Sequence, residues 1–127
     1  MVSLREMKNQ ILYDHFCGGA LIGPSLVLTS AHCLIKVNPS ELIAVLGILI
    51  RTDTSSYARS NTYRVSKFIL HENYTKNQPE NDIALIFLSR PVILSSNVSI
   101  ICLPDMKKGS DFYFRKSAVA VGWGLNK

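Results

Sequence analysis

The chain has 127 residues, enough for one compact domain with its own core and no linker. Apolar residues make up 47% and charged residues 18%, a balance that excludes intrinsic disorder. The basic residues behind the net charge of +5 are scattered along the chain, so we expect no nucleic-acid partner. The longest apolar run, Leu42–Ile50, has nine residues, whereas a membrane-spanning helix needs about 20, so we expect no membrane span.

Short apolar stretches separated by turn-forming residues predict an all-β protein, a barrel or a sandwich. Leu42–Ile50 predicts a pair of buried strands or a strand and a turn. In Ile83–Leu88 both alternating sets of side chains are apolar, which predicts a strand covered on both faces. The high mean hydropathy, +0.17, indicates an apolar face that meets another domain. In chain order the expected strands are Ala20–Ile22, Leu26–Thr29, Leu42–Ile50, Val65–Leu70, Ile83–Leu88 and Ala118–Val121.

The three cysteines, Cys17, Cys33 and Cys102, leave at least one without a partner in this chain. Of the three histidines, His32 stands out by its surroundings. The motifs in chain order are His15-Phe16-Cys17-Gly18-Gly19, Leu28-Thr29-Ser30-Ala31-His32-Cys33, Asn81-Asp82-Ile83-Ala84-Leu85, Ile101-Cys102-Leu103-Pro104 and Gly122-Trp123-Gly124. Together, in this order and spacing, they resemble the chymotrypsin- or trypsin-like family of serine peptidases, over nearly the whole chain.

The resemblance implies an antiparallel six-stranded Greek-key β-barrel, the first of the family's two barrels. Residues 1–127 would then be the N-terminal barrel, truncated at both ends and without the second barrel. The family pattern also implies a Cys17–Cys33 disulfide enclosing fifteen residues, which contributes about 3 kcal/mol and persists only in an oxidising compartment. We therefore expect an extracellular protein, although Met1–Lys8 lacks the apolar stretch of a secretory signal. By the same pattern Cys102 pairs with a propeptide or a light chain.

The resemblance assigns His32 as general base and Asp82 as the carboxylate that orients it. Imidazole suits this role because its ordinary pKa lies near neutrality. Phe16 would border the bound peptide or protein substrate. The triad serine is missing: no serine has a Gly-Asp-Ser-Gly-Gly setting, and Ser110 is merely the nearest in appearance. We therefore expect a fragment of a secreted serine endopeptidase that is inactive alone.

The remaining polar residues predict no cofactor. His15 and His71 match non-catalytic family positions and are expected to be structural. Residues 46–63 contain a single carboxylate, Asp53, so the calcium site of some family members is not expected. The chain has no Cys-x-x-Cys or His-Glu-x-x-His pattern, so no zinc site is expected either.

Two other hypotheses remain open. The chain could belong to a catalytically dead protease homologue that acts as an extracellular binding or regulatory module, although such a protein has no need of His32 and Asp82. Alternatively, the 127 residues are the whole product, a lone barrel whose apolar face favours self-association.

Overall fold

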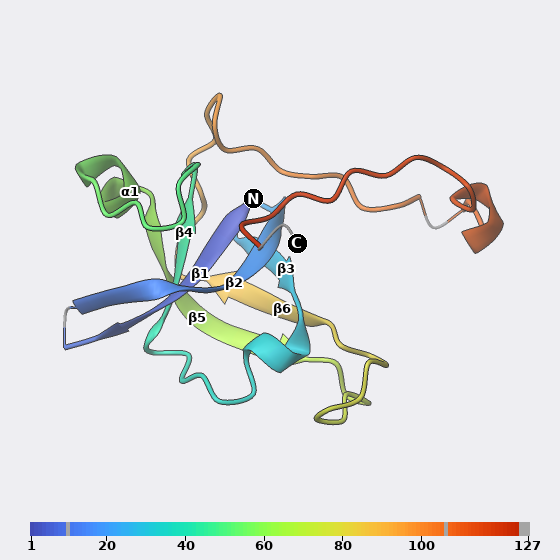
Figure 1. The fold of residues 1–127 in the computed structure, drawn as a ribbon, viewed down its shortest axis with the longest axis horizontal. Coiled ribbons are helices and arrows are strands. Elements are labelled where there is room, and N and C mark those ends of the chain that lie inside the picture. The colour runs from blue at the N-terminus through green and yellow to red at the C-terminus, as the bar shows by residue number, and fades with distance from the viewer. Residues whose placement is uncertain (10, 106, 125–127) are drawn as a thin grey trace.

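Six antiparallel strands close into a barrel in the computed structural model, which describes residues 1–9, 11–105 and 107–124 (Figure 1). The order around the barrel is β1-β2-β3-β6-β5-β4, so the chain crosses between β3 and β4 as in a Greek key. This confirms the predicted all-β, six-stranded barrel. The strands are β1 (Val2–Lys8), β2 (Ile11–Gly23), β3 (Leu26–Thr29), β4 (Leu42–Leu46), β5 (Thr62–Leu70) and β6 (Ala84–Leu88).

The long apolar run forms one strand and a turn. Within β4, alternate residues enter the barrel core, while Ile43 and Val45 face outward. The outward pair is also buried, because Ala58 of the short helix α1 (Ser56–Ser60) and Ile48 pack against it. Gly47 then turns the chain with φ of 71°, a conformation that glycine adopts without strain.

Two predictions about strands were wrong. In β6 only one face is fully buried, because Leu85 and Phe87 are half-buried and Ile83, just before the strand, is 44% exposed. Residues 118–121 form no strand, and Val119 is 87% exposed. The closed barrel explains this difference, since it leaves no free strand edge for another segment to join.

The segment after β6, orange to red in Figure 1, leaves the barrel and carries the 3-10 helix η2 (Ser110–Phe112) before it returns toward the N-terminus. Ser110 thus begins this helix, and its side chain lies outside the described part of the structure. Within the described ranges, no helix has the length and apolar content needed to cross a membrane.

Gly18 and Gly19 of β2 differ in the space around them, which generates a paired test. A Cβ at Gly19 would lie 2.8 Å from Val27 Cγ1 and 3.0 Å from the Leu28 carbonyl oxygen, whereas at Gly18 the nearest atom lies 4.0 Å away. We expect Gly19→Ala to lower the free energy of unfolding by about 1–3 kcal/mol, as overpacking does. Gly18→Ala should change it by much less. Urea denaturation of both variants measures the difference, and equal effects would contradict the prediction.

Candidate active site

The pairing of β3 with β6 brings His32 and Asp82 to one end of the barrel. Thr29, the last residue of β3, pairs with Ala84, the first residue of β6. His32 follows Thr29 on the 3-10 helix η1 (Ala31–Cys33), and Asp82 lies two residues before Ala84. Because the strands are antiparallel, the residues just beyond these two ends lie together although they are 50 positions apart in the sequence.

Asp82 holds His32 through two hydrogen bonds. Its Oδ2 lies 2.6 Å from His32 Nδ1, and its Oδ1 accepts a hydrogen bond of 2.8 Å from the His32 backbone N–H. A carboxylate that accepts from both the ring and the main chain fixes the orientation of the ring. It also favours the tautomer whose proton is on Nδ1, which leaves the Nε2 lone pair free.

The electrostatics of the pair favour an ionised Asp82. The hydrogen bonds from the His32 backbone N–H and from the ring hold the pKa of the Asp82 carboxyl below its usual value. The carboxylate side chain is 24% exposed, and the His32 side chain is 59% exposed. The His32 ring is therefore accessible to solvent, while the Asp82 carboxylate is mostly covered.

Local structure on the other side of Asp82 supports its position. Asn81 has φ of 58°, in the left-handed region that asparagine tolerates, and its side-chain amide donates to the Asn73 carbonyl. The backbone N–H of His71 donates to the Ile83 carbonyl, and the His71 ring Nδ1 accepts from the Asn73 N–H. The ring of His71 thus stabilises the turn beside Asp82.

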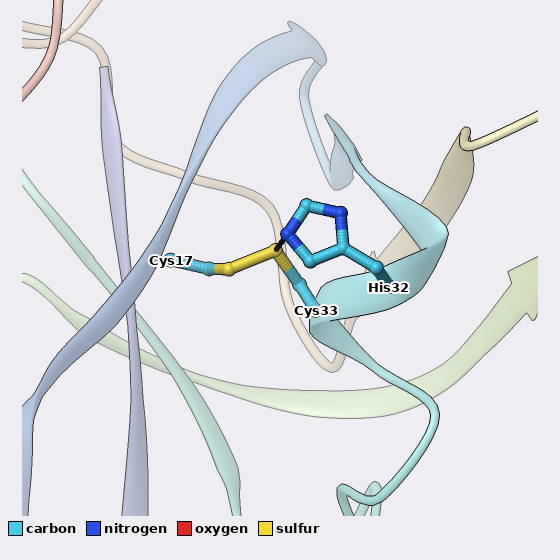
Figure 2. Close-up of side chains that lie close together, drawn as sticks. All are labelled: Cys17, His32 and Cys33. Carbon is cyan, nitrogen blue, oxygen red and sulfur yellow. Dashed lines mark hydrogen bonds between the residues drawn. A yellow bond between two sulfur atoms is a disulfide. The ribbon is translucent and has the colours of Figure 1, made fainter. Parts of the chain in front are cut away.

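The Cys17–Cys33 disulfide links β2 to η1, directly after His32 (Figure 2). The Cα atoms of the two cysteines are 6.2 Å apart, and Cys33 Sγ lies 3.5 Å from His32 Nε2. The bridge therefore tethers the backbone next to His32. Cys102 is exposed and has a free thiol in this structure.

A hollow of about 480 Å³ opens beside the histidine–aspartate pair. His32, Cys33 and Asp82 form one part of its wall. Lys36 and Lys76 also line it, so the hollow beside His32 has positively charged side chains in its wall. Phe16 lies elsewhere: it lines a second hollow, between β2 and the returning C-terminal segment, so its role beside a substrate stays a prediction.

Sequence reasoning missed a polar network on the outer face of β1. Arg5 is 1% exposed and donates to Ser3 Oγ and to the carbonyls of Arg51 and Asp53. Since Arg5 donates to Ser3 Oγ, the Ser3 hydroxyl hydrogen is free to point at His15 Nδ1, 3.0 Å away. The signal in the sequence was the apolar–polar alternation of Val2 to Arg5, with a serine and an arginine on one face.

Trp123 covers this network. Its ring lies edge-on to His15 with centroids 5.0 Å apart, and its indole N–H donates to the Leu49 carbonyl at 2.8 Å. Burial, together with the charges of Arg51 and Arg5, lowers the pKa of His15 below its usual value. A neutral His15 that accepts from Ser3 is consistent with that direction.

Comparisons with known proteins match the chain to one family. The Trypsin family profile matches residues 1–127. The chain is 30% identical to the venom peptide isomerase heavy chain of Agelenopsis aperta, covering 98% of this chain and 49% of that protein. It is 39% identical to transmembrane protease serine 11G of Mus musculus (89% and 25% covered) and 36% identical to trypsin of Sarcophaga bullata (87% and 40% covered).

The chain belongs to the trypsin family of serine proteases, and it corresponds to the N-terminal part of the family's domain. It spans half or less of the length of these curated relatives.

The Asp82 carboxyl offers a direct test of the pair. We expect its pKa, followed by the pH dependence of its side-chain carbon resonance, to lie below the usual 3.8. His32→Ala should raise it only part of the way back, because the backbone N–H of residue 32 still donates. His15→Ala, in the separate network, should leave it unchanged. A normal Asp82 pKa in the unaltered chain would contradict the geometry.

The lowered pKa of His15 predicts that the free energy of unfolding depends on pH. Its pKa is lower in the folded chain, so below about pH 6.5 the unfolded chain binds a proton that the folded chain binds less readily. The free energy of unfolding should therefore fall as pH drops through this range, by at most about 1.4 kcal/mol per pH unit for one proton.

The control is His15→Asn, which keeps a hydrogen-bond acceptor for Ser3 but cannot titrate. Urea denaturation between pH 7.5 and 5 should show a shallower slope for this variant than for the unaltered chain. An identical slope in His15→Asn would assign the effect to another group.

Proposed function

We propose that this chain is the first half of an extracellular serine endopeptidase that hydrolyses peptide bonds through a Ser-His-Asp triad. The observation that carries the proposal is the double hydrogen bond of Asp82 to the ring and the main chain of His32. The arrangement meets the need of a general base for a fixed tautomer.

In the proposed reaction, His32 Nε2 removes the proton of a serine hydroxyl as that oxygen attacks the peptide carbonyl. The imidazolium that forms is stabilised by the Asp82 carboxylate, whose lowered pKa keeps it ionised. The same histidine then donates its proton to the leaving amine. His32 and Asp82 supply base and orientation, and the serine and the oxyanion donors come from the second barrel of the same protein.

The isolated chain is proposed to be inactive, because none of its serines has the Gly-Asp-Ser-Gly-Gly setting of the nucleophile. A base without a nucleophile forms no acyl-enzyme.

The second barrel is the partner that we propose for the apolar surface of this chain. The segment that follows β6 exposes large apolar side chains: Ile101 (58%), Leu103 (58%), Phe114 (71%), Val119 (87%) and Val121 (74%). Such a run of exposed apolar residues indicates an interaction surface. Together with the hollow of about 940 Å³ beside it, the run offers a second domain an extended contact.

We further propose that Cys102 forms a disulfide with a propeptide or light chain. Its free, exposed thiol is accessible to such a partner. The Agelenopsis aperta relative is named a heavy chain, a term for one chain of a larger protein. The Cys17–Cys33 bridge supports the extracellular location, because structural disulfides persist in oxidising compartments.

The function is tested with the protein that the gene encodes past codon 127. If the gene continues with the serine motif, the whole domain should react with a fluorophosphonate probe and cleave peptides. In that domain Asp82→Asn should lower kcat on the order of 10⁴-fold, as the equivalent change does in the best-studied triad of this family. His32→Ala should lower it at least as much, while His15→Ala, in the separate network with Ser3, should remain active.

Labelling of the isolated 127-residue chain serves as the control and should be negligible. Stoichiometric labelling would contradict the absence of a nucleophile. A gene that continues with another residue in place of the serine would instead favour the binding or regulatory homologue.

A further inference from the structure

The loop between β5 and β6 carries an N-glycosylation motif that the proposed reaction does not use. Asn73-Tyr74-Thr75 has the Asn-x-Ser/Thr pattern with a residue other than proline in the middle. The chain has one other such motif, Asn97-Val98-Ser99, whereas Asn38-Pro39-Ser40 is excluded by its proline. Because a three-residue motif occurs often by chance, the surroundings of each asparagine must decide between the two.

We propose that Asn73 is an N-glycosylation site. Its backbone is fixed, since the Asn73 N–H donates to His71 Nδ1 at 3.2 Å and its carbonyl accepts from the Asn81 side-chain amide at 3.3 Å. Asn73 is exposed, and its own side chain makes no hydrogen bond within the described residues. The side-chain nitrogen is therefore open to solvent. The inference rests on the proposed extracellular location, because this modification belongs to secreted proteins.

Asn97 is less suited, although it is also exposed, because its side-chain amide has a partner. Asn97 Nδ2 donates to the Tyr57 hydroxyl at 3.5 Å. Val98, in the middle of this motif, is 4% exposed and belongs to the core cluster. The backbone groups of Ser95 and Val98 bond to each other, which closes a tight turn around Asn97. A sugar on Asn97 would have to share its nitrogen with Tyr57, whereas a sugar on Asn73 has no such competitor.

A glycan on Asn73 would stand beside the hollow that contains the His32–Asp82 pair. Tyr74, the next residue, lines that hollow, and Asn81, which holds the Asn73 carbonyl, immediately precedes Asp82. Glycans are bulky and hydrophilic, so one at this position leaves this edge of the barrel to solvent and not to a packed domain. This is consistent with a second barrel that docks elsewhere, on the apolar segment after β6.

The modification is a group transfer that requires a glycosyl donor. The donor is an oligosaccharide whose C1 carbon is bonded to a lipid pyrophosphate. The Asn73 side-chain nitrogen attacks C1, so that a carbon–nitrogen bond forms and the bond from C1 to the pyrophosphate oxygen breaks. The nitrogen loses one proton, and the lipid pyrophosphate leaves with the electron pair of the broken bond. The Thr75 hydroxyl is part of the motif but is not consumed.

The test delivers the full chain, behind a cleavable secretion signal, into microsomes during translation. Every variant carries Asn97→Gln, so Asn73 lies in the one remaining motif. We expect one glycan per chain, seen as a heavier band that peptide N-glycosidase returns to the unmodified mass. Asn73→Gln and Thr75→Ala should each abolish the shift, whereas Thr75→Ser, which keeps the hydroxyl, should retain it.

Cleavage of the signal shows that the chain has entered the microsome, whatever the natural location of the protein. An unshifted chain with a cleaved signal, or a shift that survives Asn73→Gln, would overturn the proposal. An inactive whole domain would count against the proposed endopeptidase alone, because glycan attachment needs no catalysis by His32.

A second measurement uses the chain with both motifs intact. Deglycosylation in water labelled with heavy oxygen converts each glycosylated asparagine into a labelled aspartate, and mass mapping should find the label at Asn73. The glycosylated chain should also form the Cys17–Cys33 bridge, because the Asn73 side chain makes no hydrogen bond within the described barrel. A label at Asn97 alone, or a glycan that prevents the bridge, would overturn the inference.

Discussion

The antiparallel pairing of β3 with β6 is the constraint on which the rest of the site depends. Its register sets Thr29 opposite Ala84, so His32, which follows β3, and Asp82, which precedes β6, lie at the same end of the barrel. The other contacts refine that placement: the disulfide tethers η1 from one side, and the turn held by His71 supports residues 81–83 from the other.

The outer face of β1 carries polar side chains that are buried. Arg5 is buried there and donates hydrogen bonds to the Ser3 hydroxyl and to two backbone carbonyls. These bonds connect β1 to the segment before α1. Buried charges are costly unless hydrogen-bonded, so this network ties residues 51–53 to the barrel at a defined position. Trp123 completes the cover from the far end of the chain. The barrel thus has an apolar interior and a polar outer layer on one side.

Much of the fold could be predicted from the sequence, because apolar stretches such as Leu26–Thr29 alternate with clear turn signals and the motifs resemble one family. The prediction of a strand at residues 118–121 was wrong. Four apolar residues do not indicate whether a neighbouring strand has a free edge, and the closed barrel has none. His32 and Asp82 were found through their motifs, yet their distance depends on a register that no local pattern contains. The Arg5 network was missed for a similar reason: its acceptors are backbone carbonyls, which every residue possesses.

The separation of 50 residues between His32 and Asp82 has a consequence for how the protein matures. Bringing residues so distant in sequence together costs loop-closure entropy, which the pairing of β3 with β6 must offset. A nascent or partly folded chain therefore carries a histidine without an oriented tautomer. The hydrogen bond between His32 and Asp82 can form only after β3 and β6 have paired. An oriented His32 ring therefore requires the folded barrel.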